Sequence, residues 1–287
     1  MMMGAGIGFR RFRSRVNCWG EVGFTMALIY LGGPLSGWLL AEVFFRSEPM
    51  LFTGIILIAT TSTTLSTCVI FTRMAGGDEA LALWLSVGSS LLAALVSPPL
   101  LHLMLGEELV VPVGMLIREL LLVLFAPLSA GMLLRALLGE QRVAPVGPLL
   151  TKSCSLIVLT VIMVSVANGR EMLSGPRSLK IMLAVVAFYL VRLLLWRIAV
   201  VFTGFSRARR IASLFCSVEK TLQIPAYLAV SVIGAPAAAV APVAHHVVQL
   251  VADSLLVSYF RSGGDKEAAT RTAPADNPNR PGTDAPA

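Results

Sequence analysis

Residues 60–67 read TTSTTLST, and residues 216–225 read CSVEKTLQIP. Each stretch interrupts an apolar run long enough to cross a bilayer, which takes about 20 residues as a helix. Backbone that loosens at membrane depth is tolerated only where protein or a water-filled cavity surrounds it. Two such breaks in separate parts of one chain point to the binding site of a secondary transporter.

The composition places the chain in the membrane class. Of its 287 residues, 56% are hydrophobic and only 14% are charged, whereas soluble domains carry about 25% charged residues. The net charge of +7 comes from arginines at the ends of apolar runs, where membrane topology needs them. We therefore expect the lipid bilayer as partner, and no nucleic acid. The four cysteines show no paired spacing, so neither a zinc site nor a disulfide framework is predicted.

The apolar runs predict an all-α polytopic membrane protein with about eight transmembrane helices. The runs cover residues 22–45, 50–72, 79–105, 113–138, 150–168, 179–203, 209–233 and 238–260. The excess of lysine and arginine on one side of this stack predicts that both termini are cytoplasmic, in the inner (plasma) membrane. The expected division is a basic cytoplasmic N-terminus (1–21), a transmembrane transporter domain (22–260) and a disordered cytoplasmic tail (261–287).

The seventh run carries the strongest candidate ion site. Glu219 and Gln223 are four residues apart, so on a continuous helix they share a face and present oxygens to one hard cation such as Na⁺. Lys220 points about 100° away on such a helix. Its ammonium either neutralises Glu219 or occupies a cation position permanently. Thr221 adds a hydroxyl, and the alternative is a structural ion pair that holds two helices together.

Two further polar groups lie in the second and third runs. Ser66, Thr67 and Cys68 belong to a hydroxyl-rich stretch that is expected to line a polar cavity, although such residues also serve helix packing. Ser86 in the third run shares a helix face with Ser90, and packing is an equal alternative there.

The last run carries a polar stripe. His246, Gln249 and Asp253 fall on one helix face and are expected to line the same polar interior, with protonation of His246 or Asp253 as one route to coupling. Arg192 and Arg197 in the sixth run are expected to extend to the membrane interface.

These segments resemble the bile acid:sodium symporter family, and especially its orphan, cotransporter-like branch. Three motifs carry the resemblance, in the correct order: STCVIFTRMAGGDEA at 66–80, FCSVEKTL at 215–222 and HVVQ at 246–249. The resemblance implies a core bundle with two crossing discontinuous helices, here 22–105 and 179–260. It also implies a flatter panel, here reduced to 113–168 because the family's first two helices have no counterpart.

The resemblance also implies roles for residues. Sodium-coupled members carry an ExxxQ pattern, which Glu219 and Gln223 reproduce as ligands of a possible Na⁺ ion. Their polar pair in the first crossing helix corresponds to Thr67 and Cys68, or to Ser66 and Thr67. Three positions depart from the sodium-coupled pattern: Ile29, Ala82 and Lys220.

The expected function is secondary active transport of a small organic anion by alternating access, coupled to sodium or protons. Lys220 would either replace one sodium ion or attract the carboxylate of the substrate. The alternatives are an arsenite-type metalloid efflux carrier that relies on Cys68, and a non-transporting membrane scaffold. The chain carries no HExxH motif and no GxSxG in a suitable context, so no enzyme is expected. No cofactor other than a coupling Na⁺ ion is expected, and a homo-oligomer is left open.

Overall fold

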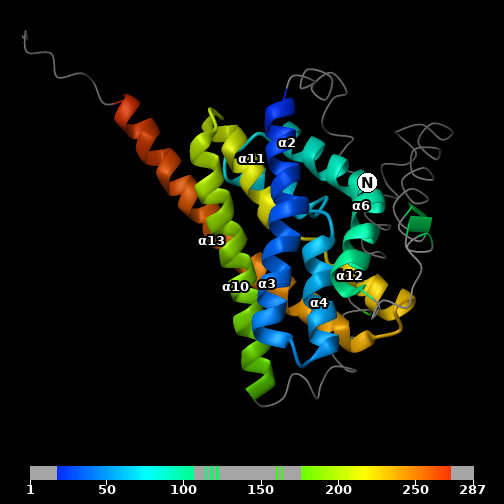
Figure 1. Cartoon of the computed structure of the whole chain (residues 1–287). Helices are drawn as coiled ribbons and strands as arrows, with labels where there is room; N and C mark the ends of the chain where they lie inside the picture. The colour runs from blue at the N-terminus through cyan, green and yellow to red at the C-terminus, as the bar shows by residue number, and fades with distance from the viewer. Residues whose placement is uncertain are drawn as a thin grey trace, which may run out of the picture.

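The computed structural model describes residues 18–106 and 176–272, with a few isolated positions between them (Figure 1). The regular elements of this part of the chain are all helices and it holds no strand, which confirms the predicted all-α class. Its elements are α2 (Trp19–Ala27), η2 (Leu28–Gly32), α3 (Gly33–Phe45), α4 (Pro49–Thr60), α5 (Thr67–Met74), α6 (Glu79–Leu105), α10 (Pro176–Ala199), η4 (Val200–Phe202), α11 (Arg207–Val218), α12 (Gln223–Tyr227), η5 (Leu228–Val232), η6 (Pro236–Ala239) and α13 (Val240–Thr272).

Four helical stretches in the described residues are long and apolar enough to cross a membrane. They are Trp19–Phe45, Glu79–Leu105, Arg177–Phe202 and Pro236–Ser262. In Figure 1, α10 and α13 lie on one side of the bundle, and α6 and α12 lie on the other. These four stretches agree with the predicted first, third, sixth and eighth spans. The predicted spans 113–138 and 150–168 lie outside the described residues.

The outer faces of these helices are apolar in the way that lipid requires. On α3 and the turn before it, large side chains exposed by more than half recur every four residues: Leu31, Leu35, Leu39 and Val43. The same spacing recurs on α13 with Val247, Val251, Leu255 and Tyr259. Soluble proteins rarely expose contiguous apolar patches larger than a few hundred Å². These stripes therefore fit a multi-pass membrane protein whose outer surface contacts acyl chains.

The two predicted breaks are present, and they meet. Helix α4 ends at Thr60 and α5 begins at Thr67, while α11 ends at Val218 and α12 begins at Gln223. The backbone N–H of Thr221 in the second break donates to the carbonyl of Ser62 in the first, at 3.1 Å. Hydroxyl side chains help to end α4, because the hydroxyl of Thr61 donates to the carbonyl of Ile58 in competition with helical bonding.

The loops gather into two groups, one at each end of the bundle. At one end, Arg209 of α11 pairs with Glu21 of α2 at 2.6 Å, and Arg207 donates to the carbonyl of Phe260. At the other end, Lys180 of α10 pairs with Glu48 before α4. This segregation agrees with the alternating topology predicted from the runs.

Two boundaries differ from the prediction. Helix α2 begins at Trp19, inside the segment that was assigned to the N-terminus. Helix α13 continues to Thr272, past residue 261, where the cytoplasmic tail was predicted to begin. The run DKEAA at 265–269 explains this, because Ala, Lys and Glu are good helix formers even though a Gly-Gly pair precedes them. Residues 273–287 lie outside the description.

Helix α4 packs closely against the start of the last span. A methyl group added at Gly54 would lie 2.4 Å from the carbonyl oxygen of Ala238, a backbone atom that cannot move aside. We expect Gly54→Ala to lower the free energy of unfolding by about 1–3 kcal/mol, as overpacking does. The measurement is the thermal unfolding midpoint of the detergent-purified protein.

The matched control is Gly23→Ala in α2, where an added methyl group meets nothing within 4 Å. Because alanine favours helix over glycine, this variant should unfold at the wild-type temperature or above it. Equal midpoints for the two variants would contradict the packing of α4 on η6.

Candidate ion and substrate site

Lys220 reaches the carboxyl end of α4, which is the first half-helix of the broken second span. Its side chain is buried, and its ammonium donates to the carbonyls of Thr61 at 2.6 Å, Ala59 at 3.0 Å and Ile29 at 3.2 Å. Two of these carbonyls lie at the end of α4, where the last four carbonyls lack helical partners and the helix dipole is negative. The third lies in η2, a π-helical turn of a kind often found at functional sites.

Glu219 reaches the amino end of α5, which is the second half-helix of the same span. One of its carboxylate oxygens accepts hydrogen bonds from the hydroxyls of Thr64 and Thr67, at the start of α5. The other carboxylate oxygen is buried and has no hydrogen-bond partner in the part of the chain that the structure describes. The positive end of the α5 dipole favours an anion at this position. Thr64 was quoted in the hydroxyl-rich stretch but was not selected as a site residue.

The adjacent charges of Glu219 and Lys220 are therefore divided between the two halves of the broken second span, with Lys220 at the end of α4 and Glu219 at the start of α5. Neither side chain belongs to an ion pair within the described part of the chain. Lys220 was predicted either to neutralise Glu219 or to occupy a cation position permanently. The geometry favours the cation position. The structural ion-pair alternative is not supported by this arrangement.

Gln223 does not join Glu219. The prediction that the two share a helix face is wrong, because residues 219–222 are not helical and the phase of the helix is lost. Glu219 is buried, whereas Gln223 is exposed and its side-chain oxygen accepts from the hydroxyl of Thr221 at 2.7 Å. Ser66 is also exposed and lies just before α5, so of the residues expected there only Thr67 reaches Glu219.

Cys68 and Ser86 lie together behind the first break. The thiol of Cys68 is buried, donates to the carbonyl of Thr64 and lies 2.9 Å from the hydroxyl of Ser86. Ala82 lies one turn before Ser86, and its carbonyl accepts the Ser86 hydroxyl. These two predicted site residues are therefore next to Thr64, a direct partner of Glu219.

The last span supports the second break through Gln249. Its side-chain oxygen accepts the backbone N–H of Lys220 at 2.8 Å. The buried face of α13 carries His245, Gln249 and Asp253 at a spacing of four, and His246 is half-buried beside them. The sequence selected His246 for this stripe, but the fully buried histidine is His245. The hydroxyl of Tyr189 on α10 donates to Asp253 at 2.6 Å.

The position of Arg192 differs from the one predicted from the sequence. The expectation that it extends to the interface is wrong, because it is only 3% exposed, while Arg197 is exposed as expected. Among the described residues, all three guanidinium nitrogens of Arg192 lack a hydrogen-bond partner, and the group lies 5.5 Å from the ring centroid of Phe188. Buried charges are normally paired. The signal that could have identified it is an arginine in the middle of a 24-residue apolar helix.

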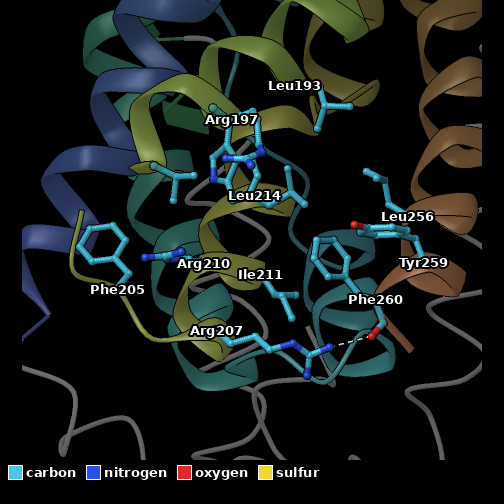
Figure 2. Close-up of a pocket in the computed structure, with 12 residues that line it drawn as sticks. Leu193, Arg197, Phe205, Arg207, Arg210, Ile211, Leu214, Leu256, Tyr259 and Phe260 are labelled. Carbon is cyan, nitrogen blue, oxygen red and sulfur yellow. Dashed lines mark hydrogen bonds between the residues drawn. The ribbon is translucent and has the colours of Figure 1, made fainter. Parts of the chain in front are cut away.

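A separate cavity of about 730 Å³ lies toward the end of the bundle that holds Arg207 (Figure 2). Its walls are aromatic and aliphatic, and three arginines line it: Arg197, Arg207 and Arg210. Trp196, one turn along α10 from Arg192, is part of the wall. Glu219 and Lys220 do not line this cavity, so it is distinct from the place where the breaks meet.

Comparison with known proteins agrees with this architecture. The profile of the SBF-like CPA transporter family matches residues 1–262 of the 287-residue chain. The chain belongs to this transporter family. A zebrafish (Danio rerio) protein named sodium/bile acid cotransporter 7 is 27% identical over 209 residues, which cover 70% of the chain. The matched part spans 61% of that relative's length.

Membership of the SBF-like CPA transporter family confirms the predicted family resemblance and the expectation that the chain is not an enzyme. It also agrees with the predicted multi-pass membrane protein. Near Glu219, the unpartnered carboxylate oxygen and the hydroxyls of Thr64 and Thr67 are hard oxygen donors that suit Na⁺.

Proposed function

We propose that this protein is a secondary active transporter of a small organic anion, driven by one coupling cation that binds at Glu219. The observation that carries the proposal is the meeting of two broken helices, with Glu219 and Lys220 at opposite half-helix ends. Half-helix ends at a repeat interface bind substrates and coupling ions in many transporters. Because Glu219 lies between α11 and α12, whereas the half-helix ends belong to α4 and α5, relative movement of these spans changes the cation affinity.

An anionic substrate is supported by the unpaired positive charge in the core. Arg192 has no partner for its guanidinium nitrogens, and a guanidinium offers a planar fork that binds a carboxylate with two hydrogen bonds. Beside it, Trp196, His245 and Gln249 also hold buried polar atoms without partners. A carboxylate or sulfonate entering this region would supply the acceptors that Arg192 lacks.

The proposal also includes a membrane location and a topology. The protein works in the inner (plasma) membrane, with both termini cytoplasmic. The end of the bundle that carries Arg207, Arg209 and Arg210 is then the cytoplasmic end, as the excess of positive charge favours.

The direct test is uptake into proteoliposomes of purified protein. The probes are a radiolabelled bile acid, a monocarboxylate and a sulfonate, each with an inward sodium gradient, an inward proton gradient or no gradient. The proposal expects at least one anion to accumulate above equilibrium with one of the two gradients. Accumulation of none of them with either gradient, by protein that is shown to be folded, would contradict the proposal.

The metalloid alternative makes an opposite prediction at Cys68. Its thiol is buried and already bonded to Thr64 and Ser86, so it is poorly placed as a metalloid ligand. We expect Cys68→Ser to retain anion uptake within about twofold, because a hydroxyl replaces the thiol in the same hydrogen bonds. Cells expressing the wild type should gain no arsenite resistance. Resistance that the serine variant loses would favour the alternative.

A further inference from the structure

The ammonium of Lys220 is bound in the way that proteins bind a free monovalent cation. Its three N–H groups meet three backbone carbonyls, from Thr61, Ala59 and Ile29, and the side chain is 1% exposed. An ammonium has three donors and no acceptor, so these contacts use its full hydrogen-bonding capacity. Rings of backbone carbonyls are also the ligands that replace the hydration shell of alkali ions in channels.

The carbonyls are available because of the local fold, whether or not lysine is present. Most carbonyls at the end of α4 have other partners: that of Ile58 accepts the hydroxyl of Thr61, and that of Thr60 accepts the hydroxyl of Ser97 at 2.6 Å. The carbonyls of Ala59 and Thr61 accept Lys220. Without the ammonium, a negative half-helix end would be buried with unpaired acceptors, which is costly.

A free sodium ion does not fit beside Lys220. A methyl group added at Gly33 would lie 3.1 Å from the Lys220 ammonium and 2.3 Å from a guanidinium nitrogen of Arg192. Both positive groups therefore pack against the same glycine, and a third positive charge would be repelled. The bound ammonium also has no donor left for a substrate carboxylate, so the role of Lys220 as a carboxylate partner is not supported.

We propose that Lys220 is a tethered cation that permanently fills a monovalent cation site formed by Ile29, Ala59 and Thr61. The cation site itself does not depend on the proposed function. Only its consequence for coupling rests on that function, which it deepens. A charge that never leaves the protein cannot be exchanged with solvent during transport. The carrier then couples through Glu219 alone, and the site at Lys220 contributes its charge as a fixed part of the moving core.

The test removes the tether and asks whether a free cation takes its place. Lys220→Ala leaves the three carbonyls and an open space, whereas Lys220→Met removes the charge but fills the space. Both changes are made together with Glu219→Gln, so that the proposed coupling site does not contribute. Thermal unfolding is measured in sodium, potassium, ethylammonium and choline chloride at equal ionic strength.

We expect sodium, potassium or ethylammonium to raise the unfolding midpoint of the alanine variant by about 2–4 °C or more relative to choline. The methionine variant and the Glu219→Gln parent should respond to none of them. A response shared equally by all three proteins, or by none, would overturn the proposal. If the alanine variant does not fold in choline, folded yield with and without ethylammonium is the readout, and no recovery with any small cation overturns it.

These measurements do not require transport. A missing thermal response with intact anion uptake would reject the tethered cation and leave the carrier function standing. A clear thermal response in a protein that transports no anion would support the tethered cation and reject the carrier function.

Discussion

Glu219→Gln should lower gradient-driven anion uptake by about 100-fold, as the loss of a buried charge from a binding site does. Glutamine keeps the size of the side chain and an oxygen that accepts the hydroxyls of Thr64 and Thr67. It removes the negative charge and replaces the unpartnered oxygen with a donor, which cannot bind a cation. The initial rate of uptake into proteoliposomes measures the effect.

The matched control is Glu42→Gln. Glu42 pairs with Arg46 at 3.7 Å near a helix end, away from the breaks, and surface ion pairs contribute little. Its uptake should equal that of the wild type. If Glu219→Gln keeps more than half of the wild-type rate with the same dependence on the gradient, Glu219 does not bind the coupling cation.

Arg192→Met should separate stability from function. Burying an unpaired charge is expensive, so an apolar side chain of similar length should raise the free energy of unfolding, by about 1–4 kcal/mol if Arg192 behaves like other replaced buried charges. Uptake should fall by about 10- to 100-fold, because a hydrogen bond to a charged group contributes about 1.5–3 kcal/mol. The two measurements are the thermal midpoint and the Michaelis constant for the anion.

The control is Arg197→Met, a little over one turn along α10, where the arginine is exposed and lines the separate cavity. This variant should change neither the midpoint nor the Michaelis constant by much. A less stable Arg192→Met protein with unchanged uptake would show that Arg192 stabilises the fold and does not bind the substrate.

The broken spans were predictable because hydropathy is a local property. Seven hydroxyl-bearing residues within residues 60–67, and Glu219 beside Lys220, are too polar for a continuous lipid-facing helix, wherever the rest of the chain lies. The same local signal predicted that Thr67, Lys220 and Gln249 belong to one polar interior, and these residues do contact the two breaks.

The prediction for Gln223 failed because it assumed helical phase across residues 219–222, which do not form a helix. Glu219 has φ of −66° and ψ of 145°, so counting residues at 100° each no longer gives the direction of the following side chains. The failure at Arg192 has another cause. An apolar run with residues of similar hydrophobicity all round does not reveal which face of the helix is turned inward.

Composition and order along the chain were enough to predict a polytopic helical membrane protein with two interrupted spans and a charged pair in the second of them. The destinations of those charges depended on tertiary structure. Lys220 binds carbonyls from positions 29, 59 and 61, and every residue carries a carbonyl, so no side chain marks the place where one is left unpaired. Only the packing of α4 and η2 around the second break makes those oxygens converge.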